Sequence, residues 1–375
     1  MTTIHRGLDG VVVDRTAISH VNLDTNSLTY QGYPVQELAR HCSFEQVAYL
    51  ILHGELPDAD ALQAFKAAER ASRKLPRGLW DAINRLPLSC HPMDVLRTAV
   101  SHIGAQDLNS DVETASADLA RALDLFAKLP SVVAADQRRR RGLDPVPPDP
   151  GMNFAENFLY MCFGEVPEPE VVAAFEVSLI LYAEHGFNAS TFTARVVTST
   201  KSDLYSAVIA AIGALKGPLH GGANEAVMRM MDEIADPSKV SAWLESALRD
   251  KKLIMGFGHR VYKNGDSRVP IMQEALWKLA AKHADGARLT GIYTRLADHM
   301  LRTKNLYPNL DFPAGPAYSM IGLDIPTFTP VFVLSRITGW AAHILEQSSA
   351  NALIRPLSHY SGVAEREVPR VLQRN

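Results

Sequence analysis

The chain has 375 residues, of which 47% are hydrophobic and 21% are charged, and its formal net charge at pH 7 is −3. This composition is typical of a globular protein, and the length exceeds what one compact core usually needs, so we expect two domains. The small net charge gives no support to a nucleic-acid partner, and the chain lacks the run of about 18 apolar residues that would predict a membrane span.

The cysteines and the N-terminus favour a cytoplasmic protein without a bound metal. Cys42, Cys90 and Cys162 are far apart in sequence and lack the spacing of a zinc site or of a disulfide framework. The first residues, MTTIHRGLDG, have neither the apolar core of a secretory signal nor the arginine-rich character of a transit peptide.

The first predicted element is a β-hairpin. Residues 10–21 are rich in β-branched side chains, the segment NLDTNS supplies turn-forming residues, and SLTYQGY forms the returning strand.

Helices follow the hairpin for the rest of the chain. The first begins after the N-cap candidate Ser43 and ends at Gly54. Apolar residues at three- and four-residue spacing predict others over residues 58–74, 93–104, 112–128 and 171–184. Two long apolar helices are expected from Thr329 and from His343. Because no strands alternate with these helices, we predict an all-α fold with a small N-terminal β-hairpin.

Glycine- and proline-rich segments predict the main loops. These segments are residues 142–151, 216–222 and 307–316. The second and third loops would bound a smaller inserted domain of residues 222–317, whereas residues 1–221 and 318–375 would form the larger domain.

Four polar side chains in such loops are candidates for acid–base chemistry: His185, His220, His259 and Asp311. Each of them alone is more often structural, because a histidine in a turn or an aspartate after Pro-Asn commonly satisfies local backbone groups. No P-loop, H-E-x-x-H or G-x-S-x-G motif competes with them, and GFGHRV contains only half of a dinucleotide fingerprint.

Three arginines accompany these candidates: Arg268, Arg336 and Arg355. Arg336 interrupts an otherwise apolar helical sequence, so it needs an anionic partner, which either a structural ion pair or a ligand would supply. Guanidinium groups bind the carboxylates of a small diacid in bidentate fashion. The run Arg138 to Arg141 is interpreted as a solvated surface segment, with a ligand-phosphate contact as the alternative.

Together these residues indicate a chemistry. A carboxylate such as Asp311 can remove a proton from a carbon next to a carbonyl group, and histidines can polarise carbonyl oxygens. His220 precedes a helix, whose N-terminus lowers the pKa of an imidazole and favours a neutral donor to an enolate. The set therefore predicts proton abstraction followed by carbon–carbon bond formation.

Five segments, in the family's order, resemble the sequence blocks of the citrate synthase family. They are EHGFNAST, GPLHGGANE, GFGHRVYKNGDSR, YPNLDF and SRITGWAAHILEQ with a following Arg-Pro. The resemblance extends over nearly the whole chain and implies an all-α fold with a large and a small domain that closes over the substrates.

The resemblance also implies residue roles. His220 would hydrogen-bond the thioester oxygen, Asp311 would remove the α-proton, and His259 would protonate the oxaloacetate carbonyl. Oxaloacetate would be held by His185, Arg268 and Arg336, and by Arg355 from the other subunit of a homodimer. Asn188 would support this site, and Arg73 resembles an additional substrate contact. Coenzyme A, a co-substrate rather than a bound cofactor, would lie along Leu253, Ile254, Met255, Gly256, Phe257 and Gly258.

Within the family, the segments HPMDVLRTAVSHIGAQD and YAEHGFNASTFTARVVTST are most similar to bacterial 2-methylcitrate synthases. This similarity implies condensation of propionyl-CoA, and also acetyl-CoA, with oxaloacetate. We expect the small residues Ala314 and Gly315 to leave room for the propionyl methyl group. The alternatives are a dedicated citrate synthase and a non-catalytic CoA- or oxaloacetate-binding paralogue. A dimer is expected because the chain begins at the hairpin, without the additional N-terminal region of the larger hexameric enzymes.

Overall fold

The computed structural model describes residues 4–110, 112, 114–262 and 264–368. A three-stranded antiparallel sheet near the N-terminus consists of β1 (Ser19–Asn22), β2 (Ser27–Tyr30) and β3 (Tyr33–Pro34). The predicted hairpin is confirmed, but its first strand begins at Ser19 rather than at residue 10. The backbone before it is directed elsewhere, because the Ala17 N–H donates to Glu346 Oε1 at 2.9 Å instead of to a neighbouring strand.

The other regular elements of the described residues are helices, which confirms the predicted all-α fold. The α-helices are α1 (Val35–His41), α2 (Phe44–His53), α3 (Ala59–Ser72), α4 (Arg77–Asn84), α5 (Pro92–Gln106), α6 (Ala115–Arg140), α7 (Phe154–Phe163), α8 (Pro169–Tyr182), α9 (Ala189–Ser199), α10 (Leu204–Leu215), α11 (Ala223–Ile234), α12 (Val240–Arg249), α13 (Val269–Ala280), α14 (Gly286–Lys304), α15 (Asp311–Ile321) and α16 (Phe328–Ser349).

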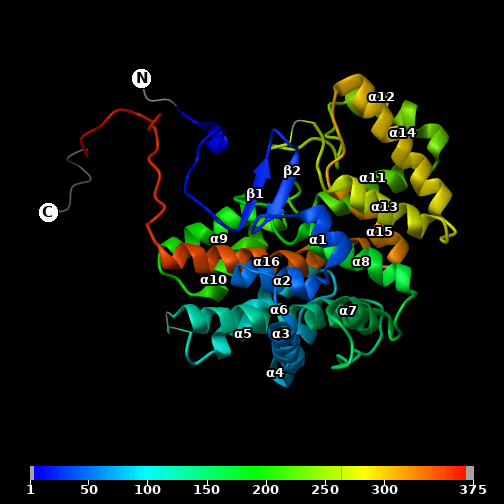
Figure 1. Ribbon diagram of the computed structural model, residues 1–375. Coiled ribbons are helices and arrows are strands. Elements are labelled where there is room, and N and C mark those ends of the chain that lie inside the picture. The colour runs from blue at the N-terminus through cyan, green and yellow to red at the C-terminus, as the bar shows by residue number, and fades with distance from the viewer. Residues whose placement is uncertain (1–3, 111, 113, 263, 369–375) are drawn as a thin grey trace.

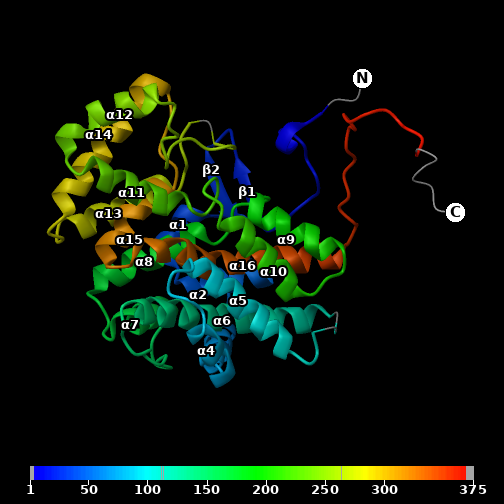
Figure 2. The ribbon, with the colours of Figure 1, turned by 180° about the vertical axis from the view of Figure 1, so that it is seen from behind.

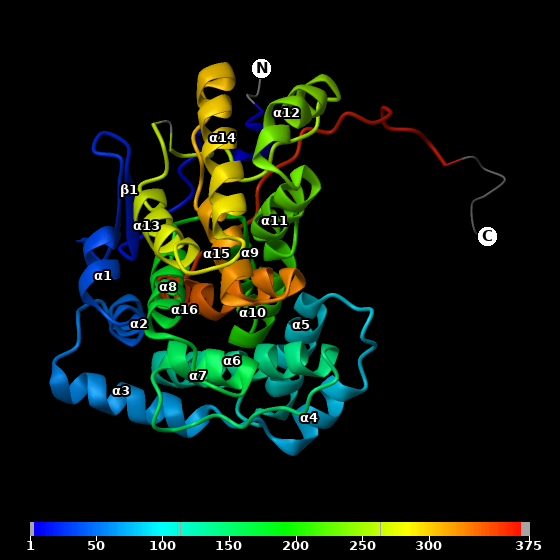
Figure 3. The ribbon, with the colours of Figure 1, turned by 90° about the vertical axis from the view of Figure 1, so that its right-hand side faces the viewer.

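These helices are arranged in layers around α16. Figure 1 shows α3 to α7 below α16, and Figure 2 shows the same order from behind. The end-on view in Figure 3 places α11 to α15 together at the opposite end from α3 and α4. This grouping agrees with a separate unit near residues 222–317, although the domain boundaries remain a prediction. No helix in the described part of the chain is both long and apolar enough to cross a membrane.

Helix α16 forms the centre of the fold, and all but two of the residues from Phe328 to Gln347 are buried. The prediction of two helices, from Thr329 and from His343, is wrong, because a single helix runs through both segments. No proline follows Pro330 within it, so the backbone hydrogen-bond ladder continues. A Cβ at Gly339 would lie 2.6 Å from the Ala183 carbonyl oxygen, so glycine permits a close approach there.

Local capping explains several helix boundaries. Ser43 and Gln46 form the capping box of α2, which ends at Gly54 in a left-handed conformation (φ 90°), as the sequence predicts. Asp58 caps α3 by accepting from the Ala61 N–H at 2.8 Å.

The sequence places the start of α15 incorrectly. The predicted loop over residues 307–316 ends at Leu310, and the helix begins at Asp311 with Pro313 in its first turn. Proline is tolerated there because the first N–H groups of a helix have no partner within the helix. The Asp311 N–H donates to Asn309 Oδ1 at 3.1 Å, which fixes the helix start.

The arginine run at the end of α6 lies at the surface, with Arg138 to Arg140 half-buried and Arg141 exposed, but its side chains also have structural partners. Arg139 donates to Asp136 Oδ1 at 2.7 Å and to the Leu86 carbonyl oxygen. Arg140 donates to Asp136 Oδ2 at 2.7 Å and to the Leu88 carbonyl oxygen. Arg141 forms an ion pair with Asp324. These bonds hold the chain around the C-terminal end of α6, so the alternative of a ligand-phosphate contact has no support.

Aromatic side chains fill the core between α2, α6 and α7. The ring centroids of Phe44, Phe126 and Phe154 lie 4.6 to 5.7 Å apart, and all of these side chains are buried. Such pairs add to the free energy already gained from burying their apolar area.

Phe44→Ala should therefore lower the free energy of unfolding by about 3–5 kcal/mol, because it leaves a cavity that the neighbouring helices fill only partly. Urea unfolding followed by circular dichroism measures this loss. Leu88→Ala, at a side chain that is 55% exposed, is the control and should cost less than about 0.5 kcal/mol. Equal losses in the two variants would contradict this description of the core.

Candidate active site

One cavity of about 990 Å³ gathers most of the predicted site residues. It lies between the loop before α9, the turn before α11, the loop before α13 and the start of α15, and α16 contributes to its lining. The predicted residues in its lining are His185, Asn188, His220, Leu253, Ile254, Met255, Gly256, Phe257, Gly258, His259, Arg268, Asp311 and Arg336.

Two of the predicted catalytic and binding residues do not line this cavity. Arg73 is only 2% exposed, and its guanidinium donates to Glu69 and to the carbonyl oxygens of Asp149 and Met152. These partners give Arg73 a structural role, and its predicted substrate contact has no support in this subunit. Arg355 is exposed in the extended segment after α16.

Asp311 is half-buried at the first position of α15. Its Oδ1 accepts a hydrogen bond of 2.6 Å from the Tyr182 hydroxyl. Burial raises the pKa of Asp311 to about 6, whereas the hydrogen bond from Tyr182 and the charge of Arg268 lower it. The carboxyl group is thus ionised at neutral pH and is poised to accept a proton.

His220 lies on the turn before α11. Burial lowers its pKa to about 3, and the charge of Arg336 acts in the same direction, so the ring is neutral at neutral pH. The Ser190 backbone N–H, which can only donate, points to His220 Nε2 at 3.3 Å. Asn188 Oδ1 also lies 3.2 Å from Nε2, but it already accepts from the Ser190 hydroxyl and from the Thr191 N–H. Nε2 is therefore the acceptor, and Nδ1 carries the proton that can be donated to a ligand oxygen.

His185 and His259 lie beside each other, with ring centroids 4.9 Å apart. His259 Nδ1 accepts from the backbone N–H groups of Val261 and Tyr262, at 3.0 and 3.2 Å, so its Nε2 carries the ring proton. Burial and the charge of Arg268 lower the pKa of His185 well below its usual value. Among the described residues, His185 Nε2 has no hydrogen-bond partner.

Arg268 and Arg336 supply two buried positive charges in different settings. Arg268 is paired with Asp266, at 2.9 Å from its Nε and 2.6 Å from its Nη2. Arg336 is 1% exposed and donates from Nε to the Tyr182 carbonyl oxygen at 2.7 Å. No carboxylate of the described residues lies within 4.0 Å of Arg336. Its charge is thus available to an anionic ligand.

The loop at residues 256–258 is tied to the segment that precedes Asp311. Asn309 N–H donates to the Gly256 carbonyl oxygen at 2.9 Å, and its Nδ2 donates to the Gly258 carbonyl oxygen at 3.0 Å. Gly256 has φ 82°, and a Cβ there would lie 2.9 Å from the side chain of Phe312. Glycine is therefore required at this position. Lys263, within the GFGHRVYKNGDSR segment, lies outside the described residues.

Sequence reasoning missed Tyr182 and Phe332, which both line the cavity. Tyr182 ends an apolar helix sequence, and no pattern in the sequence points to its contact with Asp311. The expectation that Ala314 and Gly315 make room for an acyl group is wrong, because neither lines the cavity. Gly315 instead packs against α11, where a Cβ would lie 2.9 Å from the Asn224 carbonyl oxygen.

No group of histidine, cysteine or acidic side chains in the described ranges is placed to hold a metal ion. The arrangement provides a base, neutral imidazole donors and a cationic nest. This nest consists of the guanidinium groups of Arg268 and Arg336, which are shielded from water.

Comparison with known proteins agrees with this geometry. The family model "Citrate synthase, C-terminal domain" matches residues 7–357. The chain is 61% identical over 365 residues to a citrate synthase of Mycolicibacterium smegmatis, covering 97% of each chain. It is 60% identical over 366 residues to a 2-methylcitrate synthase of Mycobacterium tuberculosis, covering 98% of this chain and 92% of the relative.

A solved structure gives the same result for the fold. The ternary complex of carboxymethyl coenzyme A and oxaloacetate with citrate synthase from Thermoplasma acidophilum has a TM-score of 0.94 and 34% sequence identity, and the match covers 100% of both chains. The chain belongs to the citrate synthase family.

Proposed function

We propose that the protein condenses propionyl-CoA, and also acetyl-CoA, with oxaloacetate and water to give 2-methylcitrate or citrate and free coenzyme A. The observation that carries this proposal is the convergence of Asp311, His220 and His259, from three separate segments of the chain, beside the buried Arg268 and Arg336. The names of the relatives and the ligands of the Thermoplasma complex support the same reaction.

Oxaloacetate binds in the cationic nest. The guanidinium groups of Arg336 and Arg268 hold its carboxylates. His185 Nε2 is buried and has no partner among the described residues, so it donates to the ligand without competition from water. Asn188 acts less directly: its Oδ1 caps α9 by accepting from the Thr191 N–H at 3.1 Å, which fixes the loop that carries His185.

The thioester is activated by a base and a neutral donor. Asp311 removes the α-proton of the acyl group, while His220 donates from Nδ1 to the thioester oxygen and stabilises the resulting enol. The enol carbon then bonds to the oxaloacetate carbonyl carbon, and the carbonyl oxygen takes a proton from His259. Water hydrolyses the thioester bond, which leaves the product carboxylate and the coenzyme A thiol.

Coenzyme A lies along residues 253–258, whose side chains or backbone border the cavity next to His259. Residues 222–317 form the small domain in this proposal and close over the bound substrates, which keeps the enol from water. The reaction takes place in the cytoplasm.

A citrate synthase and a 2-methylcitrate synthase are similar to this chain at 61% and 60% identity. The preference between acetyl-CoA and propionyl-CoA must therefore be argued from the cavity. Tyr182 and Phe332, with ring centroids 4.2 Å apart, border the space near Asp311. One methylene contributes only about 1–3 kcal/mol of discrimination in an apolar pocket. A dedicated citrate synthase is the second candidate. A non-catalytic paralogue is disfavoured, because the acid–base residues are all present.

The first prediction concerns the two thioesters. Both should release thiol in the presence of oxaloacetate, and kcat/KM for propionyl-CoA should equal or exceed that for acetyl-CoA, because the methylene gains apolar contact. Steady-state assays with a thiol reagent measure both values. Turnover of acetyl-CoA alone would identify a dedicated citrate synthase, and turnover of neither would refute the proposed function.

The second prediction concerns the pH dependence set by Asp311. Protonation below a pKa of about 6 removes the base, so kcat/KM for the thioester should fall with decreasing pH below that value. Tyr182→Phe removes a hydrogen bond that lowers this pKa, so the acidic limb of the profile should move to higher pH. Tyr160→Phe, at a tyrosine outside the cavity lining, is the control. An unmoved limb in the Tyr182 variant would contradict the assignment.

The third prediction concerns Arg355 and the homodimer. The segment after α16 is extended and leaves the body of the subunit (Figure 1), and Leu357 and Tyr360 in it are 89% and 74% exposed. These features suit a segment that packs on a partner subunit and completes its oxaloacetate site. Arg355→Ala should therefore raise the KM for oxaloacetate by at least about tenfold, because a charge-assisted bond to a carboxylate is lost.

Mixed dimers test whether Arg355 acts across subunits. Subunits that carry Arg355→Ala are combined with subunits that carry Asp311→Asn. If Arg355 acts on its partner, one intact site forms in each mixed dimer and activity returns, whereas the separate variants remain impaired. Absence of recovery in mixed dimers that sediment normally would place Arg355 in its own subunit's site or in neither.

A further inference from the structure

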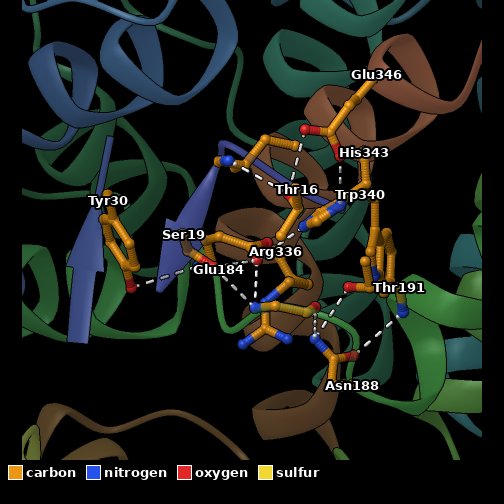
Figure 4. A network of polar contacts seen from close by, with 12 residues as sticks. Thr16, Ser19, Tyr30, Glu184, Asn188, Thr191, Arg336, Trp340, His343 and Glu346 are labelled. Carbon is orange, nitrogen blue, oxygen red and sulfur yellow. Dashed lines mark hydrogen bonds and ion pairs between the residues drawn. The ribbon is translucent and has the colours of Figure 1, made fainter. Parts of the chain in front are cut away.

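The loop that carries His185 contains a second buried side chain, Glu184, for which the proposed reaction has no use. Glu184 is 0% exposed, and its Oε1 accepts from the Ser19 hydroxyl at 3.0 Å and from the Gly186 backbone N–H. Figure 4 shows Glu184 close to Ser19, Arg336 and His343. This carboxylate thus holds the turn on both sides of His185.

A chain of polar contacts keeps Glu184 in place. His343 Nε2 lies 2.9 Å from Glu184 Oε1, and His343 Nδ1 lies 3.1 Å from Arg195 Nη1. A guanidinium group can only donate, so Nδ1 is the acceptor and Nε2 carries the proton that is donated to Glu184. Arg195, itself 2% exposed and paired with Glu346 at 2.6 Å, therefore selects the tautomer of His343.

The other oxygen of Glu184 has a tightly defined position. Glu184 Oε2 has no hydrogen-bond partner among the described residues, and it lies so close to Gly339 on α16 that a Cβ at this position would overlap it. Burial alone would raise the pKa of Glu184, but the hydrogen bond from His343 and the charge of Arg336 hold it below the usual value. Glu184 is thus an ionised group packed against the same helix that carries Arg336.

We infer that Glu184 is a positioning residue for the oxaloacetate site, held by the contacts from Arg195 through His343, and that it fixes the turn from which His185 reaches the ligand. This inference rests on the proposed function. Residues that orient a metal-binding histidine from behind change its metal affinity about 10- to 100-fold when they are altered, and we expect an effect of the same order on a histidine that binds an organic anion.

The direction of the effect distinguishes positioning from simple electrostatics. Glu184→Gln removes a negative charge next to Arg336, which by electrostatics alone would strengthen the binding of a dianion and lower its KM. If Glu184 positions the turn, the neutral amide holds the Gly186 N–H, Ser19 and His343 less firmly. The KM for oxaloacetate should then rise, by about 10- to 100-fold, while kcat and the KM for the thioester stay within about threefold of wild type.

The experiment compares Glu184→Gln with Glu69→Gln, which alters a similarly buried glutamate that pairs with Arg73 outside the cavity. Melting temperature and the three steady-state constants are measured for both variants. Oxaloacetate binding is also measured by titration calorimetry, which requires no turnover. A selective rise of the oxaloacetate KM and Kd in Glu184→Gln supports the inference. An unchanged or lower value, or an equal rise in Glu69→Gln, overturns it.

Variants at two further positions keep the test decisive if Glu184→Gln does not fold. Ser19→Ala removes the hydroxyl that donates to Glu184 and that accepts from the Gly186 N–H, both at 3.0 Å. The substitution places no new group in the core. It should raise the oxaloacetate KM by at least threefold, and no rise would overturn the inference. His343→Gln keeps one donor and one acceptor, so it should retain more oxaloacetate affinity than His343→Leu, and equal losses would contradict the His343 link. A wild-type protein that binds oxaloacetate but turns over no thioester would refute the proposed function alone.

Discussion

The buried guanidinium of Arg336 is the constraint on which the rest of the site depends. It lies at the middle of α16, at 1% exposure, and donates to the Tyr182 carbonyl oxygen. Burial lowers the pKa of Arg336 to about 10, whereas the charge of Glu184 raises it. The buried cation is thus destabilised, and the surrounding structure must hold it in place. A dianionic ligand offers the missing carboxylate partner, which explains why a long apolar helix contains a charged residue at its centre.

A single charge of this kind also organises the neighbouring groups. It helps to keep His220 neutral, and Tyr182, whose carbonyl oxygen accepts from Arg336, presents its hydroxyl to Asp311. Arg336 on α16 is thus linked to Asp311 through Tyr182, the last residue of α8, and to His220 through its charge. Because the loop at 256–258 is bonded to Asn309 just before Asp311, movement of this loop on thioester binding would be transmitted to the base.

Much of this arrangement could be predicted from the sequence, and the exceptions have physical reasons. The glycine- and proline-bordered motifs identified His185, His220, His259 and Asp311, because such local backbone patterns are visible along the chain. The partner of Asp311 was not predictable, because Tyr182 lies 129 positions away and ends an ordinary apolar helix. Periodicity likewise could not show that α16 is continuous or that the arginines of α6 bond to distant carbonyl groups, since both depend on tertiary packing.

In the proposed reaction, the cationic nest binds oxaloacetate independently of the base that acts on the thioester. Asp311→Asn separates the two, because the amide keeps the size of the side chain but cannot accept the proton. Oxaloacetate should bind this variant with a Kd within about threefold of wild type, while thiol release falls by at least about 10³-fold. Thiol release at a near-wild-type rate, or loss of oxaloacetate binding together with activity, would contradict the account.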